Sequence, residues 1–387
     1  MPAEPFLVLR IPGLDMSKNI YHNIRAQWAA YIAFFLLLAL VPVFVGNSFV
    51  VNQLGRYCVF GMLAVSVCLV WGYGGILSLG QGIAFGLAAY GMAMTMQLQS
   101  QDPVNNPVPS FMLSNELEQL PALWEPFWST PGGIGLALLV PVAFFAIFGL
   151  LMFQARVAGV FVAIMTLAVL SAWYSMVYDM QPFTGGFSGI TPPAPLHLGS
   201  AILDPYTPAA YWVVLAVLAF VTLGAKLLLQ SRFGLVVQAI RGDPERARFL
   251  GYSVAFYQVV LFALSGLVAA LAGVCWVMLV QYVSPTSMEV TFSISMVIWA
   301  AVGGRLSLLG SIIGAFLVNG MQSYLGDQLL NVFMLVLGGV FIVVVRFLPD
   351  GLAGLFELVL GAPGRRRMRA SATSAADAGP RAVETRA

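Results

Sequence analysis

Long apolar stretches alternate with short polar segments along most of this chain. A run of about 20 apolar residues is long enough to cross a bilayer as a helix. The pattern predicts about ten spanning helices and an all-α polytopic membrane fold. The expected spans are residues 28–45, 51–71, 82–98, 133–153, 158–178, 210–229, 255–280, 287–302, 311–325 and 328–346. The third, eighth and ninth are short or rich in glycine, so the pattern defines their ends least well.

The composition is that of a protein that faces lipid. Apolar residues make up 60% of the 387 positions and charged residues 9%, with a mean hydropathy of +0.89. Soluble domains carry about 25% charged residues, so this chain cannot cover a globular surface in water. The formal net charge is only +2, and the basic residues lie at the ends of the apolar segments. They form no basic face, which argues against nucleic acid as a partner.

Basic residues are distributed unequally between the loops. The two long loops, 99–132 and 179–209, contain no Lys or Arg, and only Arg56 is basic elsewhere on the same side of the expected topology. Because cytoplasmic loops concentrate Lys and Arg, we expect both long loops outside and both termini in the cytoplasm. Proline and aromatic residues punctuate these loops, which favours ordered turns. The expected parts are a cytoplasmic segment 1–27, a transmembrane domain 28–360 with a cytoplasmic loop 230–254, and a disordered basic tail 361–387 that can contact lipid headgroups.

Several kinds of chemistry are missing from the sequence. The predicted spans carry no charge at their centres, whereas ion-coupled carriers keep titratable residues there. Neither Lys18 nor Lys226 follows a glycine, so the phosphate-binding motif of an ATPase is absent. The only histidines are His22 and His197, which excludes a histidine metal cluster. We therefore expect a chain that is not an enzyme, holds no metal or cofactor, and either takes its energy from another subunit or acts as an ATP-independent facilitator.

Two glycine-rich segments are candidates for lining a path. Residues 72–91 read GYGGILSLGQGIAFGLAAYG, and residues 184–191 read TGGFSGIT. Glycine lets a helix break so that backbone polar groups face a cavity, and hydroxyl and amide side chains suit a neutral polar solute. The alternatives are close helix packing for the first segment and a simple turn for the second. The candidate path residues are Gly74, Gly75, Ser78, Gly80, Gln81, Thr184, Gly185, Gly186 and Ser188.

One short string occurs twice. Residues 74–79 read GGILSL and residues 303–308 read GGRLSL, so five of six positions match. The copies follow the second and eighth expected spans, which gives them the same orientation in the membrane. The recurrence indicates an internal repeat or a coincidence.

The inner loop 231–258 reads SRFGLVVQAIRGDPERARFLGYSVAFYQ. Asp243 can cap a short helix that Pro244 opens and Gly251 closes. With Phe249 and Leu250 on its apolar side, such a helix is what a soluble ATPase would bind, although many charged loops are merely solvated. The candidate coupling residues are Arg241, Gly242, Asp243, Pro244, Glu245, Arg246, Arg248, Leu250 and Gly251.

Taken together, these motifs and the strings FALSGLVAALAG, AVGGRLSLLGSIIGA and FLPDGLAGL resemble the hydrophobic amino-acid uptake family of ABC importer permeases, over residues 51–357. The family comprises membrane subunits for branched-chain amino acids, urea and short amides. The stretch PVPSFMLSNELEQLPALWEPFW and the long loop 99–132 resemble its urea branch. The chain departs from the usual family pattern in three places. Gln258 stands where Lys is common, and Leu306 and Ser307 stand where the family usually has Gly and Thr. The string FSGIT stands where urea members tend to have NNGLT.

The resemblance implies a set of partners. A second permease subunit would pair with this chain, two cytoplasmic ATPases would bind ATP and Mg, and a periplasmic protein would deliver the solute, all at a bacterial inner membrane. It implies that residues 241–251 couple the permease to the ATPase and that residues 72–82 and 184–191 help to line the path. The expected solute is urea or a short amide, with a branched-chain amino acid as the alternative.

Overall fold

The computed structural model describes residues 16–102, 107–198, 201–325, 338–339 and 351–352. The chain divides into two compact units, residues 1–47 and residues 48–387. The first unit holds α1 (Met16–Phe44), whose apolar part is Trp28–Phe44. The first expected span is therefore helical, but its helix begins at Met16 rather than at residue 28.

The second unit is also mostly helical. Its long helices are α2 (Ser48–Val67), α3 (Gln81–Gln99), α5 (Thr130–Gln154), α6 (Val160–Asp179), α8 (Pro208–Gln230), α11 (Val254–Val280), α12 (Val290–Gly303) and α13 (Leu308–Leu325). Its shorter ones are α4 (Ser110–Leu113), α7 (Gln181–Thr184), α9 (Arg232–Gly242) and α10 (Pro244–Phe249). A π-helical turn (Cys68–Tyr73) extends α2, and 3-10 turns occur at Glu125–Trp128, Gly186–Ser188 and Pro285–Met288.

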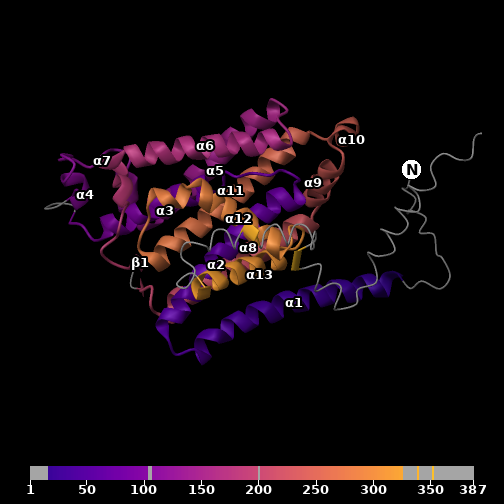
Figure 1. Ribbon diagram of the computed structural model, residues 1–387, viewed down its shortest axis with the longest axis horizontal. Coiled ribbons are helices and arrows are strands. Elements are labelled where there is room, and N and C mark those ends of the chain that lie inside the picture. The colour runs from indigo at the N-terminus through magenta and orange to yellow at the C-terminus, as the bar shows by residue number, and fades with distance from the viewer. Residues whose placement is uncertain (1–15, 103–106, 199–200, 326–337, 340–350, 353–387) are drawn as a thin grey trace, which may run out of the picture. The chain divides into compact units, whose positions relative to one another are not determined.

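The core of this unit is built around α3 and α11. All of α3 from Gln81 to Leu98 is buried except Leu87, because its many Gly and Ala residues let neighbouring helices approach closely. α11 packs against α3, α5 and α2, and α2 packs in turn against α8 and α13 (Figure 1). The residues that fill the core are apolar, with Phe85, Met92 and Met96 among the fully buried ones.

Fewer helices than expected qualify as membrane spans. Among the described residues, five are long and apolar enough: Ser48–Tyr73, Thr130–Gln154, Val160–Asp179, Pro208–Gln230 and Val254–Val280. This number supports a multi-pass membrane protein, but the expectation of ten spans is not confirmed. The third expected span corresponds to α3, which falls outside the five and is buried inside the protein.

The eighth and ninth expected spans are not confirmed as separate crossings. α12 and α13 form a pair that is bent by 118° at a short break, so together they make one broken span or a re-entrant loop. The bend is possible because Gly303 and Gly314 bring the two helix backbones into direct contact, with no room for a side chain at either position. Most of the tenth expected span, 328–346, and the tail 361–387 lie outside the described residues.

The two long loops contain ordered structure where they are described. α4 and a 3-10 turn lie in the loop 99–132, and α7 follows α6 in the loop 179–209. A small antiparallel hairpin pairs β1 (Leu196–Leu198) with β2 (Ala201–Leu203), which the all-α expectation did not include. Within this unit α9 and α10 lie at one end and α4 and α7 at the other, with α6 running between them (Figure 1).

Candidate functional site

The loop between α8 and α11 folds into two short helices with well-formed ends. The Ser231 hydroxyl caps α9 by accepting a hydrogen bond from the Gly234 amide. The Asp243 carboxylate caps α10 by accepting from the amides of Glu245 and Arg246, each at 3.1 Å. α10 ends before Gly251, whose φ of +87° is the left-handed conformation typical of a helix stop. The predicted short helix with its Asp243 cap is confirmed.

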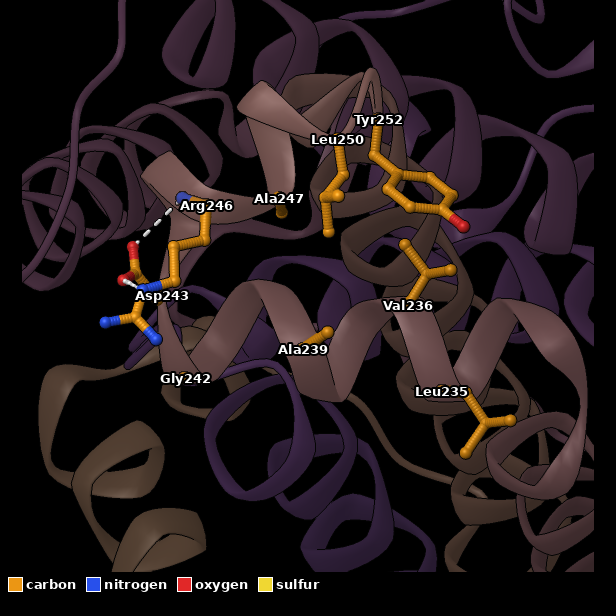
Figure 2. Close-up of a pocket in the computed structure, with 9 residues that line it drawn as sticks. All are labelled: Leu235, Val236, Ala239, Gly242, Asp243, Arg246, Ala247, Leu250 and Tyr252. Carbon is orange, nitrogen blue, oxygen red and sulfur yellow. Dashed lines mark hydrogen bonds and ion pairs between the residues drawn. The ribbon is translucent and has the colours of Figure 1, made fainter. Parts of the chain in front are cut away.

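A groove of about 650 Å³ lies between α9 and α10. Figure 2 shows Leu235, Val236 and Ala239 of α9 on one side of it and Leu250 and Tyr252 on the other, with Asp243 and Arg246 at the turn between the helices. At the end of α10, Phe249 is 90% exposed and Leu250 76% exposed. Large apolar side chains that protrude beside a polar turn are typical of a surface that binds another protein.

The two helices are anchored to the start of α11. Ile240, Ala247 and Val254 are buried against one another, with Val236 and Tyr257 packed around them. The ring of Phe233 also stacks on that of Tyr257, with the centroids 5.3 Å apart. Packed side chains therefore join α10 to α9 and to the start of α11, and close-packed interiors deform little.

The last turn of α9 contacts the first of the two glycine breaks, residues 72–79, which comprise the string GGILSL and the two residues before it. Gly75 has a φ of +72°, and a Cβ there would lie 2.9 Å from the Cγ of Arg241. Gly74 and Ile76 share a small internal space with Val237 of α9. Partial burial lowers the pKa of the Arg241 guanidinium, and the positive charge of Arg305 lowers it further. Arg241 therefore connects α9 to this break.

The first break contacts the second break, residues 303–308, through its backbone. The carbonyl oxygen of Arg305 occupies the space that a side chain at Gly72 would need. The Tyr73 hydroxyl donates a hydrogen bond of 2.7 Å to the carbonyl of Leu306, and the Cys68 thiol lies 3.1 Å from the carbonyl oxygen of Arg305. The residues directly before the string GGILSL therefore lie against the string GGRLSL.

The first candidate path segment is packed rather than open. Ser78 caps its own turn by accepting from the Gly80 amide at 3.2 Å. The Gln81 side chain is buried and donates to the Ser265 hydroxyl of α11 at 3.1 Å. Gly74 and Gly80 are buried as well, and Gly75 alone among the five candidates of this segment is exposed. These residues hold the break against α11 and do not line a pocket together.

The second candidate path segment is a folded turn at the far end of α6. The Thr184 hydroxyl donates to the carbonyls of Val177 and Met180 at 2.7 and 2.8 Å, and Gly185 follows with a φ of +75°. Gly186 is buried and Ser188 exposed. The first segment contacts Thr166 near the start of α6, about 20 Å from the end of that helix at 1.5 Å per residue. The structure does not bring the two segments together.

A pocket that the sequence analysis missed lies between α2, α12 and α13. It has a volume of about 430 Å³ and is lined by Gln53, Arg56, Tyr57, Phe60, Trp276, Thr286, Glu289, Thr291, Phe292, Ser295, Trp299, Asn319, Gln322 and Ser323. The sequence contained a signal for this pocket, because two sets of residues recur at the spacing that places them on one face of a helix. These sets are Gln53, Arg56, Tyr57 and Phe60, and Asn319, Gln322 and Ser323. Arg56 and Trp71 lie about 22 Å apart along α2 and its extension, so the pocket and the breaks are at opposite ends of that helix.

The fold defines a multi-pass membrane protein. Residues 49–345 match the family described as branched-chain amino acid transport system / permease component. The chain belongs to this family of ABC transporter permeases. It is therefore a transport subunit rather than an enzyme, and subunits of this kind work with ATPase and binding-protein partners.

The chain is also similar to individual permeases. The ribose import permease protein of Haemophilus influenzae is 23% identical over 89% of this chain and the whole of that relative. The galactose/methyl galactoside import permease protein of Escherichia coli K12 is 28% identical over 67% of this chain and 72% of the relative. The fructose import permease protein of Rhizobium meliloti is 35% identical over 28% of this chain and 31% of the relative. No solved structure matches significantly. These relatives support the family but not its urea branch.

Proposed function

We propose that this chain forms, with a second permease subunit, the membrane path for a small polar solute of no net charge, and that cytoplasmic ATPases drive it through α9 and α10. The observation that carries this proposal is the anchored helix pair. Its end exposes Phe249 and Leu250, its interior packs on α11, and Arg241 reaches the first glycine break. A solute delivered by a periplasmic binding protein at a bacterial inner membrane completes the assembly.

Three classes of solute fit this proposal. Urea or a short amide is the solute that the resemblance of the motifs favours. A monosaccharide is supported by the printed substrates of the relatives, which are ribose, galactose and fructose. A branched-chain amino acid is supported by the family's description. All three lack net charge, in keeping with spans that carry no charge at their centres.

An ATP-independent facilitator is the alternative function. Membership of a family of ABC permeases favours the ATPase-driven transporter, and so does the coupling surface on α10. Uptake by the purified chain alone in liposomes without ATP would support the facilitator instead.

The solute is identified by uptake in cells with and without this gene. Radiolabelled urea, leucine and ribose are each supplied, with the other two as unlabelled competitors. We expect uptake of one solute to be lost with the gene and restored by the plasmid-borne chain. If uptake of none is lost, a solute outside these three classes must be sought.

The coupling role is tested on the complete transporter by a double variant, Phe249→Ala with Leu250→Ala. These side chains are exposed, so their removal should leave the fold intact while it removes apolar contact area with the ATPase. We expect solute-stimulated ATP hydrolysis to fall at least fivefold, with the permease still assembled in the membrane. Leu123→Ala, an equally exposed leucine in the loop 99–132, is the matched control. Unchanged stimulation in the double variant would remove the coupling role.

A further inference from the structure

Two opposite charges face the pocket between α2, α12 and α13. Arg56 lies on α2, and Glu289 directly precedes α12. The Nε of Arg56 donates a 3.0 Å hydrogen bond to Asn52, which leaves the two terminal nitrogens available. Among the described residues neither group takes part in an ion pair, and no hydrogen bond engages the Glu289 carboxylate. Within the part of the chain that the structure describes, the pocket therefore offers one cationic and one anionic side chain without an ion-pair partner.

The wall of the pocket is held in place from both sides. Asn52, which positions Arg56, donates to the carbonyls of Pro205 and Leu279 at 2.8 and 3.1 Å. Across the pocket, the Ser323 hydroxyl of α13 accepts from Gln53 at 2.9 Å and from Tyr57 at 2.7 Å. These bonds join segments that are far apart in the sequence. A pocket whose polar groups are already oriented loses less entropy when it binds a ligand.

Aromatic rings form the floor of the pocket. The ring of Phe60 lies 5.3 Å from that of Trp276, 6.3 Å from that of Phe292 and 4.8 Å from that of Trp299. Such a cluster provides an apolar aromatic surface. Phe60, Trp276 and Phe292 are each only partly buried, so part of each side chain is accessible to a ligand.

We propose that this pocket is a solute-binding site, and that Arg56 and Glu289 select a dipolar organic solute with no net charge and an apolar flank. The inference rests on the proposed function and adds the residues that choose the solute. A dipolar solute can satisfy both charged groups at once. An anion or a cation satisfies one and leaves the other desolvated without a partner, which is costly. The aromatic floor binds the apolar flank, which urea lacks, and the 430 Å³ volume also exceeds what urea needs.

The effect of Arg56 and Glu289 on charged molecules in the pocket is measured with thiol reagents, in membranes that contain the complete transporter. Ser295 lines the pocket, and Ser295→Cys places a thiol there. The native cysteines, Cys58, Cys68 and Cys275, are buried and are replaced by Ala in the background. Methanethiosulfonates that carry a trimethylammonium, a sulfonate or a hydroxyl group report the modification rate for a cation, an anion and a neutral probe. Modification needs no ATP turnover, so the result is independent of the coupling test.

Substitutions of Arg56 and Glu289 should shift the ratio of the cationic to the anionic modification rate in opposite directions. Arg56→Gln should raise the ratio of cationic to anionic rates about three- to sixfold, and Glu289→Gln should lower it by a similar factor, as expected for one unit charge about 10 Å away in water. Arg56→Lys keeps the positive charge, so this variant should show the same ratio as the unsubstituted residue. That result separates an electrostatic effect from misfolding. At the control position Ser114→Cys, in the loop 99–132, neither substitution should change the ratio. Unchanged ratios at residue 295 would overturn the proposal.

The ligand class is tested by protection. Leucine, ribose and urea are each added before the neutral reagent. We expect leucine, a zwitterion with an apolar flank, to slow the modification of Ser295→Cys at least threefold, and we expect this protection to be lost in Arg56→Gln and in Glu289→Gln. Protection by none of the three, or by urea or ribose alone, would contradict the proposed ligand class.

Discussion

The two glycine breaks have nearly the same sequence but different neighbours. The first, residues 72–79 with the string GGILSL, contacts Arg241 of α9 and leads into α3, the most buried of the helices that the structure describes. The second, GGRLSL at 303–308, leads into α13, whose polar face lines the pocket. The two breaks contact each other at Gly72 and Arg305.

This difference shows how one motif can serve two purposes. In both places the glycines end a helix. The first break packs against α9, whereas at the second break the carbonyls of Arg305 and Leu306 face the extension of α2. Contacts therefore run from α9 through both breaks to the start of α13, and the other end of α13 lines the pocket.

The largest effect is expected where the two breaks touch. Gly72→Ala places a methyl group on the carbonyl of Arg305, so the breaks must separate. We expect a loss of about 3 kcal/mol in stability, the upper part of the range for overpacking. The measurement is the thermal unfolding midpoint in detergent.

Gly224→Ala in α8 is the control for that substitution, since a Cβ at Gly224 meets nothing within 4 Å. It should be neutral or stabilising, because Ala is the better helix former by about 1 kcal/mol. Equal midpoints for the two variants would show that the close contact between the breaks does not hold them together.

The next largest effect concerns the first break alone. Arg241→Ala removes the side chain that packs on Gly75, so a displacement of α9 would no longer reach the break. We expect solute-stimulated ATP hydrolysis to fall about tenfold, a coupling free energy of ~1.4 kcal/mol. Arg232→Ala, at the other end of α9, is the matched control and should retain stimulation. Similar losses in both variants would indicate a general effect of charge.

A smaller effect is expected at the helix cap. Asp243→Ala removes the acceptor for two amides of α10 and should cost about 1 kcal/mol of local stability. Hydrogen exchange of residues 244–249 should then become faster. Asp243→Asn keeps an acceptor oxygen and should exchange nearly as slowly as the wild type. If Asn behaved like Ala, the negative charge rather than the cap would be what matters.

The smallest effect should come from the second break. Tyr73→Phe removes the hydroxyl that donates a hydrogen bond to the Leu306 carbonyl, a bond worth about 1 kcal/mol or less. The unfolding midpoint should fall slightly, and stimulation should remain above half. Tyr206→Phe, at an exposed tyrosine, should change neither. Loss of stimulation in Tyr73→Phe alone would show that the second break depends on this one bond.

The sequence predicted uninterrupted helices well. α5, α6 and α11 begin and end within three residues of the expected spans 133–153, 158–178 and 255–280, because a continuous apolar run marks each of them. The cap of α10 was also predictable, since Asp, Pro and Gly act locally. What the sequence could not provide was the bend between α12 and α13, which depends on how closely Gly303 and Gly314 approach in space.

The solute pocket could not be predicted from hydropathy for a similar reason. An average over a window hides the polar face of α2, and the partner of Tyr57 on α13 is Ser323, 266 positions away. The candidate path residues were chosen for glycine and hydroxyl content, yet these features serve packing at 74–81 and a turn at 184–188. Their proposed role in lining the path is still untested, and the pocket is now the stronger candidate.

The central claim is that α9 and the first break move as one body. Ile76→Cys with Val237→Cys, in a background without the native cysteines, places two thiols around the same internal space, where a short bifunctional reagent can join them. The measurement is solute-stimulated ATP hydrolysis before and after crosslinking. Our account predicts that the crosslinked transporter keeps at least half of its stimulation, because the joined elements do not move relative to each other. Abolished stimulation after crosslinking, with full activity before it, would contradict the account.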